Sequence, residues 1–270
     1  GLDNKSVVKC KNMFALGICF WLFDRPEDYA KRYLDTKFAK KNPAIAQANK
    51  LAIDAGYNYA ANTHQFANNY TVAAAPLEKG TYRSISGNIA TAWGLCAAAE
   101  KAGLPLFCGS IAGICTAIGA AYAGNFAVTT TSGPGLSLKS EALGLAVMTE
   151  LPLVVVDVQR GGPSTGLPTK TEQSDLAQAL YGRNGECPVI VVAASSPSDC
   201  FHFAFEAGRL AMEHMTPVVL LTDGFIANGS EPWRIPSMKD YPKICPPIVD
   251  EAPEGGFMPY VRNERLARGW

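Results

Sequence analysis

Two short runs of glycine, proline and hydroxyl residues are the segments of this sequence best suited to bind a ligand. The first is Thr129-Thr130-Thr131-Ser132-Gly133-Pro134-Gly135, and the second extends from Asp157 to Gly166 and contains Arg160. Each run follows an apolar stretch of the kind that forms strands. Loops at the carboxyl ends of neighbouring parallel strands form the ligand crevice of an open α/β sheet. The two runs therefore predict a site for a small anionic molecule.

Arg160 is the more specific of the two signals. It follows the most apolar strand of the chain and precedes Gly161 and Gly162. The rigid fork of donors on an arginine can hold a carboxylate with two hydrogen bonds. Ser164 and Thr165 could donate further hydrogen bonds to the same ligand. The alternative is a structural arginine that pairs with Asp157 or another acid.

The Ser132–Gly135 run has two interpretations. Its glycines permit positive φ and close backbone approach, so that N–H groups at the start of the next helix could face an anion. Alternatively, the run is only a tight connection from a strand to a helix. Its spacing matches neither a Walker loop nor a dinucleotide fingerprint.

The remaining polar residues do not form a complete catalytic set. Lys139 and Glu141 lie two apart on one helix and do not share a face, so we expect them to be solvated or to cap the helix. Residues 170–173 either cap a helix or form the mouth of the site. The three histidines are isolated, and no Ser-His-Asp order, paired catalytic carboxylates or metal-ligand spacing is present. The chain is therefore expected to supply a binding wall for chemistry carried out by a cofactor or a partner.

Composition narrows the class of protein. Of the 270 residues, 48% are hydrophobic and 18% charged, which predicts a well-buried core. The 24 basic and 24 acidic residues balance to zero net charge, which argues against nucleic acid or an acidic membrane as partner. No apolar run has membrane-spanning length, and the first residues do not resemble a signal peptide. The 8 cysteines lack CxxC spacing and predict reduced thiols in the cytoplasm rather than structural disulfides.

The pattern of apolar residues predicts four regions. Residues 1–66 read as helical, and Ala44, Ala48, Leu51 and Ala55 are expected to line one helix face. Residues 67–86 are expected to be a linker. Residues 87–232 alternate between helix and strand, which predicts an α/β domain with a doubly wound parallel sheet. Residues 233–270 are predicted to form an extended, proline-rich arm that leads towards a further domain.

Within residues 87–232, ten elements are expected. The predicted strands are 104–108, 126–131, 151–158, 189–194 and 217–222, and the predicted helices are 88–102, 111–123, 136–149, 174–181 and 197–215. At Ser110-Ile111 the first strand passes into a helix without the 2–6 residues that such a connection usually takes. We therefore expect a discontinuity in the chain between residues 110 and 111.

The stretch from Gly87 to Trp233 resembles the α subunit of 2-oxoacid:ferredoxin oxidoreductases. Residues 5–66 are similar to the end of the γ domain that some of these α subunits carry fused ahead of them. The motifs that carry the resemblance are Thr129-Thr130-Thr131-Ser132-Gly133-Pro134-Gly135-Leu136, Lys139-Ser140-Glu141-Ala142, the run from Gln159 to Thr169, Tyr181-Gly182-Arg183-Asn184-Gly185-Glu186 and Asn228-Gly229-Ser230-Glu231-Pro232-Trp233.

The resemblance implies the pyrimidine-binding half of a thiamine diphosphate enzyme. It implies a β subunit that holds the diphosphate, its Mg²⁺ and a [4Fe-4S] cluster, in a dimer of αβ heterodimers. The implied reaction is oxidative decarboxylation of a 2-oxoacid with coenzyme A, and ferredoxin accepts the electrons. Arg160 would hold the substrate carboxylate beside Ser132, Gly133, Ser164 and Thr165. The wall that faces the cofactor would be formed by Thr131, Ser132, Gly133, Pro134 and Gly135.

The sequence departs from the family pattern after Ser110. The family has there a Tyr-Pro-Ile-Thr-Pro loop, a helix, a strand and an acidic turn whose glutamate activates the aminopyrimidine ring. None of these residues is present between Ser110 and Ile111. The polar loop beside Arg160 favours 2-oxoglutarate, which has a second carboxylate. Pyruvate or a branched-chain 2-oxoacid, or a non-catalytic scaffold subunit, are the alternatives.

Overall fold

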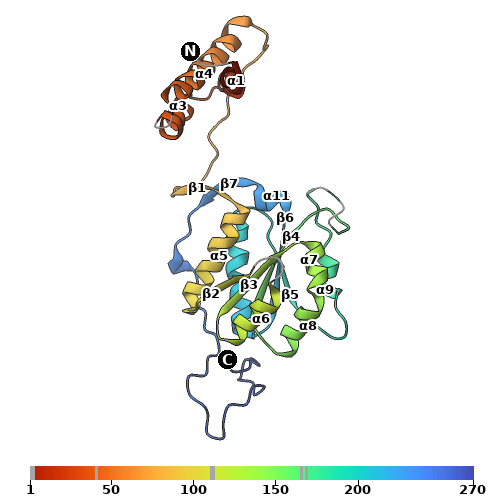
Figure 1. Ribbon diagram of the computed structural model, residues 1–270. Helices are drawn as coiled ribbons and strands as arrows, with labels where there is room; N and C mark the ends of the chain where they lie inside the picture. Colours follow the sequence, from red (N-terminus) through yellow and green to blue (C-terminus); the bar gives the residue numbers. More distant parts are fainter. Residues whose placement is uncertain (1–3, 40–41, 110–112, 165–166, 168–169) are drawn as a thin grey trace. The chain divides into compact units, whose positions relative to one another are not determined.

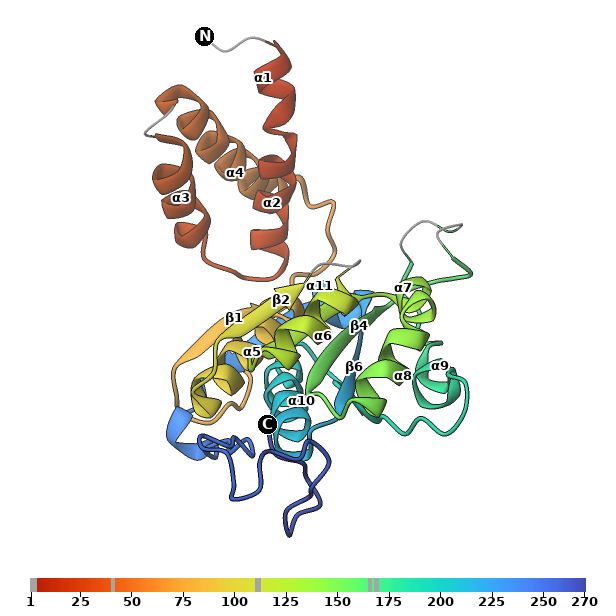
Figure 2. The ribbon, with the colours of Figure 1, turned by 60° about the horizontal axis from the view of Figure 1, so that its bottom comes forward.

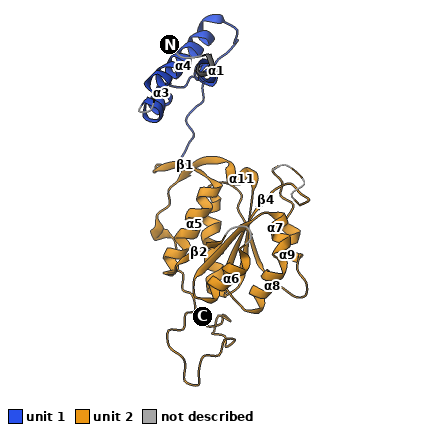
Figure 3. Cartoon of the chain, viewed as in Figure 1, with its two compact units in different colours: residues 1–78 blue, residues 79–270 orange. Residues whose placement is uncertain are grey.

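The computed structural model describes residues 4–39, 42–109, 113–164, 167 and 170–270 (Figure 1). The chain divides into two compact units, residues 1–78 and residues 79–270 (Figure 3). The join between residues 110 and 111, where a discontinuity is expected, lies outside the described residues. Within the described part, no helix combines the length and the apolar character needed to cross a membrane.

The first unit is helical, as predicted. Its elements are α1 (Asn4–Lys9), α2 (Lys11–Leu22), α3 (Asp28–Leu34), the π-helix η1 (Asp35–Ala39) and α4 (Pro43–Thr63). Asn42 caps α4 by accepting a hydrogen bond from the main-chain N of Ile45 at 3.2 Å. Helices α2 and α4 cross where each presents a glycine, because a Cβ on Gly56 would lie 1.9 Å from the carbonyl oxygen of Phe14.

The helix face that carries Ala44, Ala48, Leu51 and Ala55 is not the buried face of α4. Ala44, Leu51 and Ala55 are exposed, and Ala48 is half-buried. The buried face consists of Ala46, Asn49, Ile53, Gly56 and Ala60. Both sets have helical spacing, and the face with the glycine is the one that can approach α2 closely.

The second unit contains a parallel sheet whose strand order is β2-β3-β4-β6-β5, which confirms the predicted fold class (Figure 1). Its strands are β2 (Leu106–Gly109), β3 (Phe126–Thr131), β4 (Leu153–Gln159), β5 (Ile190–Ala193) and β6 (Pro217–Asp223). Its helices are α5 (Gly87–Ala102), α6 (Ile114–Tyr122), α7 (Gly133–Leu138), α8 (Ser140–Met148), α9 (Leu176–Tyr181), α10 (Asp199–His214) and α11 (Gly224–Asn228). The helix predicted over 136–149 is two helices that meet at Lys139.

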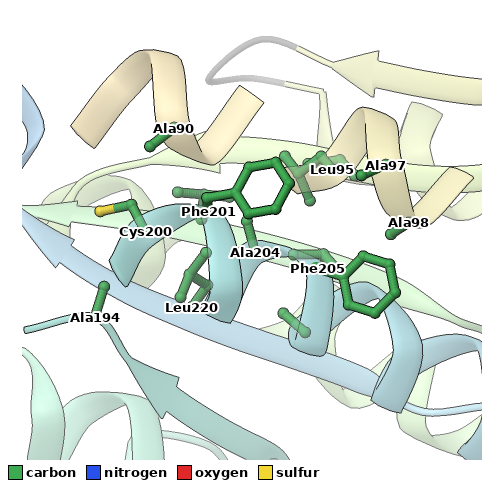
Figure 4. Packing of buried hydrophobic residues seen from close by; sticks show 14 of the residues in the cluster. Ala90, Leu95, Ala97, Ala98, Ala194, Cys200, Phe201, Ala204, Phe205 and Leu220 are labelled. Atoms are coloured by element: carbon green, nitrogen blue, oxygen red, sulfur yellow. The ribbon is translucent and has the colours of Figure 1, made fainter. Parts of the chain in front are cut away.

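Alternate residues of the central strands enter two separate cores. Val154 and Val156 face α5 and α10, whereas Leu153 and Val155 face α6, α7, α8 and α9, which Figure 2 shows together on one side of the sheet. Burial on both faces is typical of parallel strands and explains their nearly continuous apolar sequence. Figure 4 shows the first core, in which Phe201 and Phe205 of α10 lie among the alanines of α5.

A two-stranded antiparallel ribbon flanks the sheet. It pairs β1 (Tyr82–Ser86) with β7 (Ser230–Arg234). The end of the predicted linker over 67–86 therefore forms a strand, and the division between the units falls after Glu78. Beyond β7 the described chain has only the short 3₁₀ helix η2 (Met238–Asp240) before an irregular arm. The arm packs back on the domain, because Trp270 Nε1 donates a hydrogen bond to the carbonyl oxygen of Ala121 at 3.0 Å.

Glu231 of β7 caps the amino end of α10. Its Oε1 accepts hydrogen bonds from the main-chain N of Ser198 at 2.5 Å and from Ser196 Oγ at 2.7 Å. Burial alone would raise the pKa of Glu231, but these hydrogen bonds outweigh burial and lower it. The serines before this helix therefore serve as donors to Glu231, and the cap joins β7 to the core helix.

Replacing Glu231 by glutamine should destabilise the second unit by about 0.5–2 kcal/mol, the usual cost of a lost helix cap. Because the pKa of Glu231 is lowered on folding, its stabilising contribution is present at neutral pH and is lost as the pH falls below the ordinary value of 4.5. Urea unfolding of Glu231→Gln and wild type at neutral and acid pH checks this. Glu254→Gln, in the exposed arm, is the control. An equal loss of stability in that variant would contradict the assignment of Glu231 as the cap of α10.

Candidate functional site

The two predicted loops lie side by side at the carboxyl edge of the sheet. Strands β3 and β4 are neighbours, and Thr131 pairs with Asp157 in their register. The chain leaves β3 through Ser132 and leaves β4 through Arg160. Thr131, Ser132 and Arg160 line one cavity of about 570 Å³. The expectation that neighbouring strands bring these loops together is confirmed.

This cavity lies between helix α5 and the carboxyl-terminal half of the sheet. Side chains of even-numbered residues on β3 and β4 point into it, including Val156 and Val158. Val128 and Thr130 are the even-numbered lining residues of β3, and the other walls come from α5, β2 and β6, through Asn88, Thr91, Ala92, Leu95, Cys96, Leu106, Cys108 and Thr222. An apolar cavity with a few polar groups at one end is the usual form of a small-molecule site.

Arg160 is half-buried and has no acidic partner among the residues that the structure describes. Its Nη1 donates to the carbonyl oxygens of Gly161 at 3.4 Å and Ser164 at 3.3 Å. Both hydrogen bonds are long and their acceptors are neutral, so most of the guanidinium fork remains available to a ligand. The alternative in which Arg160 pairs with Asp157 is therefore not supported, since the two side chains leave β4 towards opposite faces of the sheet.

A second hollow, of about 450 Å³, lies on the other side of Arg160. Its lining is polar and includes Gly133, Pro134, Ser164, Glu172 and Asp175. The loop that follows Arg160 is closed at its base, where the main-chain N of Gly161 donates to the carbonyl oxygen of Lys170 at 2.8 Å. Of residues 170–173, Glu172 lines this polar hollow. Gln173 instead donates a hydrogen bond from Nε2 to Asp223 Oδ2 at 2.6 Å.

The predicted site residues divide between the two hollows. Thr131 and Ser132 line the apolar cavity, Gly133, Pro134 and Ser164 line the polar one, and Arg160 lines both. Gly135 is half-buried in the first turn of α7 and lines neither of them. Thr165 lies outside the described residues, and so does the position after Ser110 where the family glutamate is expected.

A group of buried ionisable residues, which the sequence did not predict, lies beneath the Ser132–Gly135 turn. Asp157 is fully buried, Asp175 is 8% exposed and Lys139 is 3% exposed. Burial, and then the neighbouring Asp175, raises the pKa of Asp157 to about 7. The expectation that Lys139 is solvated is wrong. Burial lowers the pKa of Lys139, although the nearby Asp157 opposes this shift.

Among the described residues, no group of three or more His, Cys, Asp or Glu side chains is placed to hold a metal ion. Cys96 and Cys108 are free thiols at the wall of the apolar cavity.

Comparison with known protein families matches residues 109–261 to the thiamine diphosphate-binding domain of pyruvate flavodoxin/ferredoxin oxidoreductases. The chain belongs to this family. The fold agrees, because the chain superposes with a TM-score of 0.82 on a solved 2-oxoglutarate:ferredoxin oxidoreductase from Magnetococcus marinus. That structure has 2-oxoglutarate, coenzyme A and succinyl-CoA bound, and it is 33% identical over 98% of this chain and 51% of its own.

Curated relatives of this chain are also subunits of 2-oxoacid oxidoreductases. The 2-oxoglutarate oxidoreductase subunit KorA of Mycobacterium tuberculosis is 51% identical over 99% of this chain and 45% of its own length. The 2-oxoglutarate synthase subunit KorA of Methanothermobacter marburgensis is 45% identical over 53% of this chain and 37% of its own. The chain thus spans about half or less of the length of these relatives, and the mycobacterial match includes both of its units.

Proposed function

We propose that this chain is part of the α subunit of a 2-oxoacid:ferredoxin oxidoreductase that acts on 2-oxoglutarate. The proposed reaction is oxidative decarboxylation with coenzyme A to an acyl-CoA and CO₂, and ferredoxin receives the electrons. The observation that carries the proposal is Arg160, which lines the apolar cavity and whose guanidinium makes, among the described residues, two long hydrogen bonds to carbonyl oxygens. A cation placed in this way can bind the carboxylate of a 2-oxoacid.

The cavity fits one end of thiamine diphosphate. Its largely apolar walls suit the aminopyrimidine ring, and Thr131 and Ser132 place polar groups at its edge. When bound, thiamine diphosphate supplies the carbanion-stabilising group that decarboxylation requires. This chain would hold the ring against α5, orient the substrate carboxylate with Arg160 and exclude water with Val156 and Val158.

The other components are assigned to partners. We place the diphosphate, its Mg²⁺ and a [4Fe-4S] cluster in a β subunit. The subunit names of the relatives support an enzyme of several subunits. The assembly would be a dimer of αβ heterodimers in the cytoplasm, where free thiols such as those of this chain persist. Residues 1–66 would be the helical end of a γ-type domain, and residues 233–270 would lead to a further domain.

The expected discontinuity between Ser110 and Ile111 bears on catalysis. The alignment with the mycobacterial relative is 298 residues long against 270 in this chain, a difference of 28. The relative therefore has at least that many residues within the aligned region that this chain lacks. This supports the interpretation that a segment of the family is absent from this sequence, and we place that segment, with the activating glutamate, after Ser110. The catalytic glutamate is accordingly assigned to that segment and to no residue of this sequence.

The proposal is tested with the full-length protein purified together with its β subunit. We expect coenzyme A-dependent reduction of ferredoxin or a viologen with 2-oxoglutarate, and much slower reduction with pyruvate and branched-chain 2-oxoacids. A preference for one of the latter would reassign the substrate. A complex that neither binds thiamine diphosphate nor oxidises any 2-oxoacid would contradict the proposal and favour a scaffold role.

A further inference from the structure

Two buried aspartates meet beneath the Ser132–Gly135 turn. Asp157 lies near the end of β4, and Asp175 immediately precedes α9. Within the described part of the chain, neither oxygen of Asp157 has a hydrogen-bond donor, and Oδ2 of Asp175 also has none. Ionised carboxylates only accept hydrogen bonds, and an unpaired buried charge is costly. The two groups can satisfy each other only if one of them carries a proton.

The charged groups around the pair favour a single proton. Lys139 faces Asp157 from the junction of α7 and α8, and its charge favours the ionised form of Asp157. The nearby Glu172 carboxylate raises the pKa of Asp175, whereas the Arg160 guanidinium lowers it. Burial is the largest influence on both aspartates and raises the pKa of each. One negative charge beside Lys139 is therefore tolerated, and a second is disfavoured.

Asp157 and Asp175 lie where they can determine the position of the Ser132–Gly135 turn. The Asp175 carboxyl lies directly against Gly133, where a Cβ atom would be 2.5 Å from Oδ2. The main-chain N of Asp175 donates to Gln159 Oε1 at 3.0 Å, and Gln159 Nε2 donates to the carbonyl oxygen of Thr222 at 3.2 Å. One helical turn later, Gln178 Nε2 donates to Ser137 Oγ of α7 at 2.7 Å. These contacts join β4, β6, the segment before α9 and α9 itself to α7.

We propose that Asp157 and Asp175 share one proton, and that this shared proton holds the Ser132–Gly135 turn in the position where it forms a wall of the ligand cavity. Asp157 is the donor and Asp175 the acceptor. Loss of the proton leaves two adjacent buried carboxylates, which repel each other and push the segment at Asp175 away from Gly133. Asp157 and Asp175 are positioning residues. The part of the proposal that concerns ligand binding rests on the proposed function.

The shared proton is tested by infrared spectroscopy of the full complex between about pH 6 and pH 9, a range in which ordinary carboxyls are ionised. We expect one protonated carboxyl band that disappears with rising pH. Asp157→Asn should abolish the band, whereas Glu172→Gln, which removes a neighbouring carboxylate and leaves the pair intact, should keep it. Absence of any such band in wild type, or its persistence in Asp157→Asn, would overturn the shared proton.

The positioning role is tested by the pH dependence of thiamine diphosphate binding, measured by calorimetry. In wild type the affinity should fall by up to tenfold per pH unit once the pair has ionised. Asp157→Asn should remove this part of the pH dependence, because its amide donates to Asp175 at every pH. Identical pH profiles in the two proteins would overturn the positioning role. If wild type binds no thiamine diphosphate, the proposed function fails, and the infrared band still decides whether the proton is shared.

Discussion

Replacing Arg160 by alanine is expected to raise the KM for 2-oxoglutarate about ten- to a hundredfold. A hydrogen bond to a charged group contributes about 1.5–3 kcal/mol, and each 1.4 kcal/mol corresponds to a factor of ten in binding. Within the described part of the chain, the guanidinium donates to the carbonyl oxygens of Gly161 and Ser164 alone. Its removal therefore costs little in the free protein, and the loss should appear in substrate binding.

Two further variants make this prediction specific. Arg160→Lys keeps the charge and loses the fork, so its KM should lie between those of wild type and Arg160→Ala. Arg183 is the matched control, because its guanidinium is already engaged by the carbonyl oxygens of Ala179, Leu180 and Cys187. Arg183→Ala should lower stability and leave the KM of the folded complex unchanged. Steady-state kinetics with varied 2-oxoglutarate measures all three, and an unchanged KM in Arg160→Ala would refute the assignment.

The pattern of apolar residues was sufficient to predict the sheet. Strand β3 has the predicted bounds, and β4 and β6 differ from prediction by one or two residues at their ends. These strands are buried on both faces, so the apolar character of each residue directly reflects its environment. The adjacency of the two ligand loops followed from chain order alone, because consecutive strands of such a sheet are often neighbours.

The buried charges could not be predicted in the same way. Lys139 and Asp175 occur in polar runs that are typical of helix ends, and their local sequence favours solvent exposure. In the fold both lie near the buried Asp157, which is 18 residues from each of them in the sequence. The buried face of α4 could not be predicted for a related reason. Alanine spacing identified a helix, but the position of Gly56 against Phe14 decided which face is buried.

Replacing Gly94 by alanine is expected to destabilise the second unit by about 1–3 kcal/mol, the usual cost of forcing atoms into a packed core. Gly94 lies in α5 where this helix crosses α10. A Cβ at this position would be 2.3 Å from the carbonyl oxygen of Phe201 and 2.8 Å from the Cβ of Ala204. The first of these atoms belongs to the backbone of α10, so the clash can be relieved only if the two helices move apart. Because α5 also forms a wall of the apolar cavity, ligand affinity should fall together with stability.

Gly144 provides a control with the opposite sign. It lies inside α8, and a Cβ there would meet no atom within 4 Å. Alanine is favoured over glycine in a helix interior by about 1 kcal/mol, so Gly144→Ala should stabilise the protein by up to that amount. Thermal unfolding followed by tryptophan fluorescence is suited to the comparison, because Trp93 is adjacent to Gly94 and packs against Trp233 with ring centroids 5.8 Å apart. Equal shifts in Tm for the two variants would mean that helix propensity, and not the contact between α5 and α10, determines the effect of the glycine.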